Sequence, residues 1–219
     1  MSIKAVIFDI DDTLCMTESI CLDMENEAMA LMGRKPISHE VHIETWGVVL
    51  SESMLIRSPG IDYDEFKPVF EKVLKEYVGG GRIDVVTGQN LLAIDTLIDD
   101  GKKVMLLTSR SEIELKHMLE PNHAIASRVD NIYYKDNIKY HKPDSRAFNE
   151  LLENNNLLAN ECVYVGDSVG DAMAAIGAGM YFVATLESGI RCELDFKEYD
   201  VTAFIREFPE IVDVVYGLK

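Results

Sequence analysis

The sequence is short of basic side chains. It has 21 Lys and Arg residues against 38 Asp and Glu residues among 219, which gives a formal net charge of -17 at pH 7. Nucleic acids and anionic membrane surfaces are bound by patches of Lys and Arg, so we expect neither as a partner. A phosphorylated small molecule stays compatible with this charge, provided that a local cation neutralises it.

Long apolar runs and paired cysteines are also missing. No stretch approaches the roughly 18 consecutive apolar residues of a membrane span. The first residues lack the basic-then-apolar build of a signal peptide. The four cysteines, at positions 15, 21, 162 and 192, form no Cys-x-x-Cys pair, which is typical of a reduced protein. We therefore expect a cytoplasmic protein.

A short apolar run at residues 3–8, rich in β-branched side chains, is followed at once by the carboxylates of Asp9, Asp11 and Asp12. The run predicts a buried strand rather than a helix. Carboxylates crowded at the end of a strand repel one another unless a cation or a protonation shift relieves them. Ligands of open α/β sheets bind beyond the carboxyl ends of strands, so this stretch is the first candidate for a functional site.

Apolar runs and helical patterns alternate beyond residue 86, which predicts an α/β fold: a Rossmann-like parallel sheet covered by helices on both faces. Residues 16–85 show helical patterns only, so we expect a small all-helical cap domain inserted after the first strand. The predicted core domain comprises residues 1–15 and 86–219, and the cap residues 16–85. Further strands are expected at 103–107, 131–134, 162–165 and 181–184, and helices at 90–100, 112–119, 144–154, 169–176 and in the tail.

Polar side chains follow four of these predicted strands. Asp9 follows the first, Thr108 and Ser109 the second, and Asp167 the fourth, while Lys142 lies in the loop after the third. Carboxylates such as Asp9 and Asp167 suit a hard cation, most plausibly Mg²⁺. A hydroxyl and free backbone N–H groups at a helix start suit a phosphate, and Lys142 adds a positive charge.

Two of these turns also carry helix-start patterns. Ser109 with Glu112, and Ser168 with Asp171, each fit a capping box. Asp171 therefore has two interpretations, support of a metal ion or capping of its own helix. Both stay open from the sequence.

Four motifs follow one another along the chain: Asp9-Ile10-Asp11-Asp12-Thr13, Leu106-Leu107-Thr108, Lys142-Pro143 and Gly166-Asp167-Ser168-Val169-Gly170-Asp171. In this order they resemble the motifs of the haloacid dehalogenase superfamily of phosphohydrolases. The helical insert is similar to the helical (C1-type) cap of the subclass that includes phosphoglycolate phosphatases and β-phosphoglucomutase. One departure is Asp12, where many relatives have glycine.

The resemblance implies roles for the acidic residues. Asp9 would attack phosphorus and form an aspartyl-phosphate, with Asp11 as general acid and then general base. Asp9, the backbone carbonyl of Asp11 and Asp167 would hold Mg²⁺. Asp171 would support the ion from the next layer of residues.

The resemblance also implies which groups meet the phosphate. Thr108, Ser109 and Lys142 would bind the phosphoryl oxygens. Arg57 in the predicted cap and Arg110 beside the second motif are candidate contacts of the substrate. For Arg110 a merely solvated side chain is an equal alternative.

The expected function is a Mg²⁺-dependent phosphatase acting on a small phosphorylated metabolite, phosphoglycolate-like or a sugar phosphate, in a monomer or homodimer. Three alternatives stay open: a β-phosphoglucomutase-like phosphomutase, an inorganic pyrophosphatase, and a non-catalytic binding protein on the same fold. Thr13 favours hydrolysis, because similar mutases often carry Val or Ile at this position. The presence of both Asp9 and Asp11 argues against an inactive relative.

Overall fold

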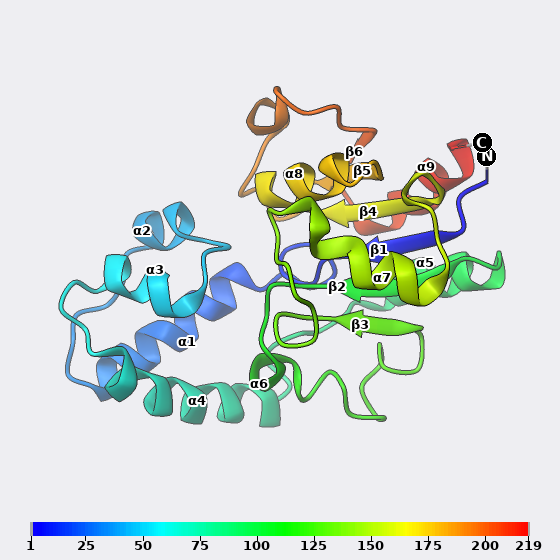
Figure 1. Cartoon of the computed structure of the whole chain (residues 1–219). Coiled ribbons are helices and arrows are strands. Elements are labelled where there is room, and N and C mark those ends of the chain that lie inside the picture. Colours follow the sequence, from blue (N-terminus) through cyan, green and yellow to red (C-terminus); the bar gives the residue numbers. More distant parts are fainter. Residues whose placement is uncertain (1, 219) are drawn as a thin grey trace. The chain divides into compact units, whose positions relative to one another are not determined.

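The structure, a computed structural model, describes residues 2–218, which form two compact units. One unit comprises the chain up to Cys15 and from Val86 onward, and the other comprises Met16–Val85 (Figure 1). None of the helices within residues 2–218 combines the length and the apolar content that a membrane crossing requires.

The first unit is built on a sheet of six parallel strands in the order β3-β2-β1-β4-β5-β6 (Figure 1). The first three strands of the sequence form one half of the sheet, and the last three form the other half. The strand order therefore reverses beside β1, the place where open α/β sheets bind ligands. The strands are β1 Ala5–Phe8, β2 Lys103–Leu107, β3 Asn131–Tyr133, β4 Cys162–Gly166, β5 Tyr181–Thr185 and β6 Ala203–Ile205.

Alternate strand residues enter two separate apolar cores, one on each face of the sheet. Phe8 of β1 packs in a core with α5 (Gly88–Asp99) and α9 (Ile211–Gly217). Ile7 packs in the other core, with α7 (Asn149–Asn155) and α8 (Val169–Gly177). Helices cover both faces, so the predicted fold class is confirmed. Shorter helical segments are α6 Glu112–Leu115, η1 Ser145–Phe148, η2 Ala159–Glu161, η3 Glu193–Phe196 and η4 Phe208–Glu210.

Three local predictions for this unit differ from the structure. The sequence analysis misses β6, whose three residues are ordered by pairing with β5 rather than by a local pattern. The helix expected at residues 112–119 ends at Leu115. Its capping box is formed by Ser111 and Glu114 instead of Ser109 and Glu112, because residues 109 and 110 belong to a turn in which Arg110 N donates to Thr108 Oγ1.

The second unit, whose residues are all described, consists of the helices α1 Glu18–Leu31, α2 His39–Glu44, α3 Leu50–Arg57 and α4 Tyr63–Gly79. Apolar side chains at helical spacing on α1 and α4 face one another and form its core. Asp62 caps α4 by accepting hydrogen bonds from the backbone N–H groups of residues 64 and 65. The fully buried members of the core include Met24, Ala28, Met29, Met54, Phe66 and Val73.

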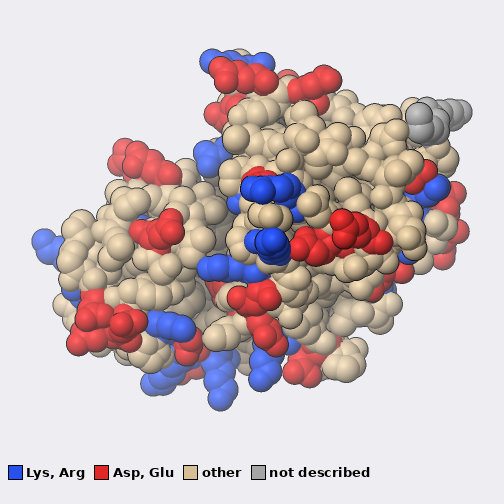
Figure 2. Space-filling model, in the orientation of Figure 1, with Lys and Arg blue, Asp and Glu red and all other residues tan. Residues whose placement is uncertain are grey.

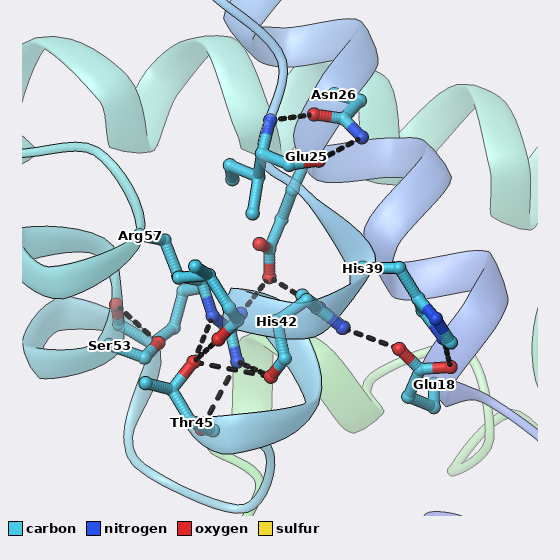
Figure 3. A network of polar contacts seen from close by, with 11 residues as sticks. Glu18, Glu25, Asn26, His39, His42, Thr45, Ser53 and Arg57 are labelled. Carbon is cyan, nitrogen blue, oxygen red and sulfur yellow. Dashed lines mark hydrogen bonds and ion pairs between the residues drawn. The ribbon is translucent and has the colours of Figure 1, made fainter.

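A buried polar network joins α1, α2 and α3 of this unit (Figure 3). Arg57 forms an ion pair with Glu25 through Nη1 and donates from Nε to Thr45 Oγ1 at 2.7 Å. His42 lies between two carboxylates, with Nδ1 2.7 Å from Glu18 Oε1 and Nε2 3.5 Å from Glu25 Oε1. Burial lowers the pKa of Arg57, although Glu25 opposes that shift. The charged groups of three helices therefore depend on one another inside this unit.

The surface reflects the excess of acidic residues. Figure 2 shows Asp and Glu side chains in several groups across the face in view, with Lys and Arg side chains interspersed among them. Acidic neighbours reduce the positive potential of basic residues arranged in this way.

We expect Arg57→Met to destabilise the second unit by about 3–5 kcal/mol, because it leaves the carboxylate of Glu25 buried without its partner. Trp46, the chain's one tryptophan, lies in this unit, so urea unfolding followed by tryptophan fluorescence reports on it. Lys67→Met is the control, since the exposed pair of Lys67 with Glu71 contributes about 0–1 kcal/mol. Equal unfolding midpoints for both variants would contradict this assignment.

Candidate active site

Three polar side chains follow neighbouring strands at the carboxyl edge of the sheet. Asp9 follows β1, Thr108 follows β2 and Asp167 follows β4. The backbone N of Asp9 donates to Val165 O at 2.9 Å, so β1 and β4 stay paired up to this edge. The parallel sheet therefore brings residues far apart in the sequence to one place.

The carboxylates of Asp9, Asp167 and Asp171 form a buried cluster, in which one oxygen of each residue lies within 4.8 Å of the others. Their exposed fractions are 7%, 5% and 0%. Asp9 Oδ1 is buried and has no hydrogen-bond partner among the described residues. Buried anions need a cation or a metal ion, and ligand sets made only of oxygen suit hard cations such as Mg²⁺. The residues present therefore fit a divalent cation.

The ammonium group of Lys142 lies against this cluster. Its Nζ is 3.0 Å from Asp9 Oδ2 and 2.6 Å from Asp171 Oδ1, and it donates to the hydroxyl of Tyr164 at 2.8 Å. The sequence analysis missed Tyr164, because an aromatic residue inside a buried strand is typical of core packing. The available signal was that a buried tyrosine hydroxyl needs a hydrogen-bond partner.

Asp171 is fixed by the start of α8. Its Oδ2 accepts from Ser168 N at 3.0 Å and from Ser168 Oγ at 2.6 Å, while Asp171 N donates back to Ser168 Oγ at 3.1 Å. The predicted capping box is thus confirmed. The other oxygen, Oδ1, accepts from Lys142. Capping therefore holds this side chain in the orientation in which it takes part in the cluster.

Burial and repulsion shift the titration of the cluster. Burial is the main cause that raises the pKa of Asp9 to about 7, because it outweighs the attraction of Lys142, and Asp171 and Asp11 add repulsion. Burial also raises the pKa of Asp167 well above its ordinary value, with Asp171 and Asp9 as further causes. Burial acts to lower the pKa of Lys142, but the attraction of Asp171 and Asp9 raises it above its ordinary value. A bound divalent cation would relieve the repulsion among these carboxylates.

Asp11 is paired with Arg110, whose Nε lies 3.0 Å from Asp11 Oδ2. The side chain of Asp11 is 27% exposed, whereas that of Arg110 is 8% exposed. Thr108 is buried beside this pair and Ser109 is exposed. Arg110, for which the sequence left substrate contact and solvation open, is therefore buried and paired with Asp11, and its contact with substrate stays a prediction.

The family described as haloacid dehalogenase-like hydrolase matches residues 6–185, a stretch that contains the whole cluster. The chain belongs to the haloacid dehalogenase-like hydrolase family. The predicted recognition is thus confirmed, and the protein is a hydrolase by family.

Curated relatives and solved structures agree with this family. A phosphoglycolate phosphatase of Photobacterium profundum is 24% identical over 225 residues, which are 97% of this chain and 96% of that protein. A phosphorylated carbohydrates phosphatase of Thermotoga maritima is 25% identical over 189 residues, 81% of this chain and 82% of that protein. The crystal structure of CbbY from Rhodobacter sphaeroides in complex with phosphate has a TM-score of 0.76 at 18% identity, and the match covers 95% of this chain and 96% of that one. A structural likeness at this identity supports the fold alone.

Asp12 is the departure from the motif of the haloacid dehalogenase-like hydrolases that the sequence analysis noted. Its φ of 49° lies in the left-handed region, which glycine adopts freely and aspartate tolerates better than most residues. Aspartate can therefore replace glycine here at a modest conformational cost. The charge of Asp12 also acts on the cluster. Burial is the main cause of the raised pKa of Asp167, repulsion by Asp171 and Asp9 comes next, and repulsion by Asp12 adds to it.

Arg57, which the sequence analysis expected as a contact of the substrate, lies in the second unit. Its guanidinium group is bound there to Glu25 and to Thr45. A buried carboxylate such as Glu25 requires a cation, and Arg57 supplies it. We therefore assign Arg57 to the packing of the helical unit instead of to the substrate.

The glycine of the family's fourth motif makes room for Asp171. A Cβ atom on Gly166 would lie 2.6 Å from both Cβ and Cγ of Asp171. We expect Gly166→Ala to destabilise the first unit by about 2–4 kcal/mol, through overpacking and loss of the capping box. Thermal unfolding followed by circular dichroism measures this effect.

Gly170→Ala is the matched control for Gly166→Ala. A Cβ atom on Gly170 would meet Ser168 Oγ at 3.6 Å and Pro143 Cβ at 3.8 Å, which are ordinary contacts. Alanine inside α8 is expected to be neutral or to stabilise by about 0.5–1 kcal/mol. Comparable melting temperatures for the two variants would show that Gly166 is not needed for space.

Proposed function

We propose that this haloacid dehalogenase-like hydrolase is a Mg²⁺-dependent phosphatase that acts on a small phosphorylated metabolite. The observation that carries the proposal is the meeting of Asp9, Lys142 and the two further carboxylates in one buried cluster. Phosphoryl transfer needs positioning and neutralisation of charge more than other chemistry, and these groups can supply both. The relatives named phosphoglycolate phosphatase and phosphorylated carbohydrates phosphatase support a phosphorylated hydroxy acid or sugar as the substrate.

Asp9, Asp167 and the backbone carbonyl of Asp11 would hold Mg²⁺, with Asp171 in support. The ion, when bound, would neutralise negative charge on the phosphoryl oxygens. The lone Oδ1 of Asp9 and the raised pKa values of Asp9 and Asp167 support this ligand set.

The chain's own residues would carry two steps. In the first, a carboxylate oxygen of Asp9 bonds to phosphorus while the bond from phosphorus to the leaving oxygen breaks, and Asp11 gives that oxygen a proton. In the second, Asp11 takes a proton from water, which attacks phosphorus, breaks the aspartyl-phosphate bond and releases inorganic phosphate. Arg110 would keep Asp11 oriented during both steps, because its buried guanidinium group is paired with the partly exposed carboxylate.

Thr108, Ser109 and Lys142 would bind the phosphoryl group. Thr108 is buried at the end of β2, and Ser109 follows it with an exposed side chain. Lys142 already lies 3.0 Å from the carboxylate of Asp9 that would receive the phosphoryl group. A point charge at this distance neutralises the group throughout its transfer.

We expect the chain to release inorganic phosphate from at least one member of a panel of phosphorylated hydroxy acids and sugars in the presence of Mg²⁺. Asp9→Asn is expected to lower kcat by at least about a thousandfold, since the amide is a poor nucleophile for phosphorus. Asp200→Asn, the same change at an exposed position, is expected to keep kcat. Phosphate release is measured by a colorimetric assay.

The other outcomes of this panel separate the alternative functions. An isomerised sugar phosphate without net phosphate release would identify a phosphomutase. When pyrophosphate is assayed beside this panel, phosphate release from pyrophosphate alone would identify a pyrophosphatase. No turnover across the panel, or equal turnover by Asp9→Asn, would overturn the proposed function.

The cation site has its own expected signature in protein stability. At a concentration of Mg²⁺ about 100 times Kd, binding stabilises the folded chain by about 2.7 kcal/mol, which corresponds to a rise in Tm of roughly 5–10 °C at about pH 8. Asp167→Asn is expected to abolish this rise, whereas Asp200→Asn keeps it. Thermal unfolding with and without Mg²⁺ is the measurement.

We expect the rise in Tm caused by Mg²⁺ to be smaller at about pH 5 than at about pH 8, and the reason is the raised pKa of Asp9. Because that pKa is about 7 in the folded chain, the folded state binds a proton that the unfolded state has released. Stability without metal therefore falls as pH rises from roughly 4 to 7, and Mg²⁺ must displace the proton at the lower end of this window. A rise of equal size at both pH values would contradict this ligand set.

A further inference from the structure

Tyr164 of β4 has a hydroxyl group that meets three other segments of the first unit. It accepts from Lys142 Nζ at 2.8 Å and lies 3.1 Å from both Leu107 O and Asp171 Oδ1. The residue is completely buried. The hydroxyl therefore sits where β2, β4, α8 and the loop that carries Lys142 come together.

The ammonium group of Lys142 has three N–H donors, and three acceptors surround it. They are Asp9 Oδ2 at 3.0 Å, Asp171 Oδ1 at 2.6 Å and the Tyr164 hydroxyl at 2.8 Å. When two of the N–H groups donate to Asp171 and Tyr164, the third N–H group points toward Asp9. Removal of either anchor would leave the ammonium group free to turn.

The same hydroxyl group also contacts the last residue of β2. Leu107, whose carbonyl oxygen it contacts, is the residue directly before Thr108. Burial raises the pKa of Tyr164 well above its ordinary value, with Asp171 and Asp9 as further causes, so the phenol keeps its proton. It can therefore donate to Leu107 O or Asp171 while it accepts from Lys142.

We propose that Tyr164 is a positioning residue that aims the ammonium group of Lys142 at the phosphoryl group carried by Asp9. This inference rests on the proposed function and deepens it. A tyrosine that only packs the core would act through its ring, which lies 4.9 Å from the ring of Phe148 and 6.4 Å from that of Phe182. Phenylalanine keeps those ring contacts and loses only the hydroxyl, so Tyr164→Phe separates the two roles.

Tyr133→Phe is the matched control. Tyr133 lies in the same apolar core at the end of β3, and its hydroxyl accepts from Asn155 Nδ2 at 3.0 Å, away from the cluster. Both variants delete one buried phenol hydroxyl. A general effect of such a deletion on the core would appear in both.

The first measurement is hydrolysis of p-nitrophenyl phosphate with Mg²⁺ by the full chain. We expect Tyr164→Phe to lower kcat about 10- to 100-fold with a smaller change in KM, because a hydrogen bond to a charged group is lost and geometry matters most in the transition state. Tyr133→Phe should stay within about twofold of the unaltered chain. Equal kcat values for the two variants would overturn the inference.

A double-mutant cycle tests whether Tyr164 acts through Lys142. In a Lys142→Met background, Tyr164→Phe is expected to change kcat by less than about twofold, since there is no ammonium group left to aim. If the two substitutions instead multiply their separate effects, Tyr164 acts on something other than Lys142, and the inference is wrong. Melting temperatures of all four proteins check that each one folds.

A second measurement does not need turnover. The ammonium signal of Lys142 in spectra of ¹⁵N-lysine-labelled protein, assigned by its loss in Lys142→Met, should broaden or shift in Tyr164→Phe and stay in place in Tyr133→Phe. An unchanged signal in Tyr164→Phe would overturn the inference even if the chain is a phosphatase. A changed signal without hydrolysis of any phosphate ester would keep the positioning role of Tyr164 and reject the proposed function.

Discussion

The constraint on which this molecule depends is an unbalanced set of buried charges. Asp9, Asp167 and Asp171 bring three carboxylates within 4.8 Å of one another, and Lys142 supplies one ammonium group against them. Like charges this close in a dry environment repel strongly, so the cluster must take up protons or a cation. The pKa of Asp9, raised mainly by burial to about 7, shows the first response. Groups with perturbed pKa values gather at functional sites, which makes this cluster the candidate active site.

The rest of the first unit is arranged so that the cluster cannot relax. Parallel pairing of β1 with β2 and β4 fixes where Asp9, Thr108 and Asp167 leave the sheet. Gly166 leaves room for the side chain of Asp171, and the capping box with Ser168 fixes its rotation. Tyr164 then ties Lys142 to the neighbouring strand. These supports are short-range and come from different strands, which makes the carboxylates resistant to moving apart.

The sequence predicted what depends on local pattern and on the order of motifs. Asp9, Thr108 and Asp167 could be found because each follows a recognisable apolar run, and the alternation of apolar runs with helical patterns predicted the α/β fold. The sequence analysis failed where the structure depends on residues far away in the chain. The three residues of β6 become a strand only through β5, and the N-cap moved from Ser109 to Ser111 because Thr108 and Arg110 form a turn beside Asp11. Tyr164 was missed, and the pairing of Arg57 with Glu25 was not foreseen, for a related reason: a side chain's partner cannot be read from spacing when that partner is more than twenty residues away.

The two buried charge networks of this chain differ in a way that bears on function. In the helical unit, Glu25 is matched by Arg57, and Glu18 contacts His42 and His39, so each carboxylate has a cationic or imidazole partner from the same unit. In the α/β unit, the negative charges outnumber Lys142. A matched network is neutralised within its own unit, whereas an unmatched one is relieved by protons or by a bound cation. The same contrast bears on how a chain of net charge -17 could accept the proposed substrate: its overall field is screened beyond about 8–10 Å, so a phosphate ester would respond to the local charge of Lys142 and of a cation bound by the carboxylates.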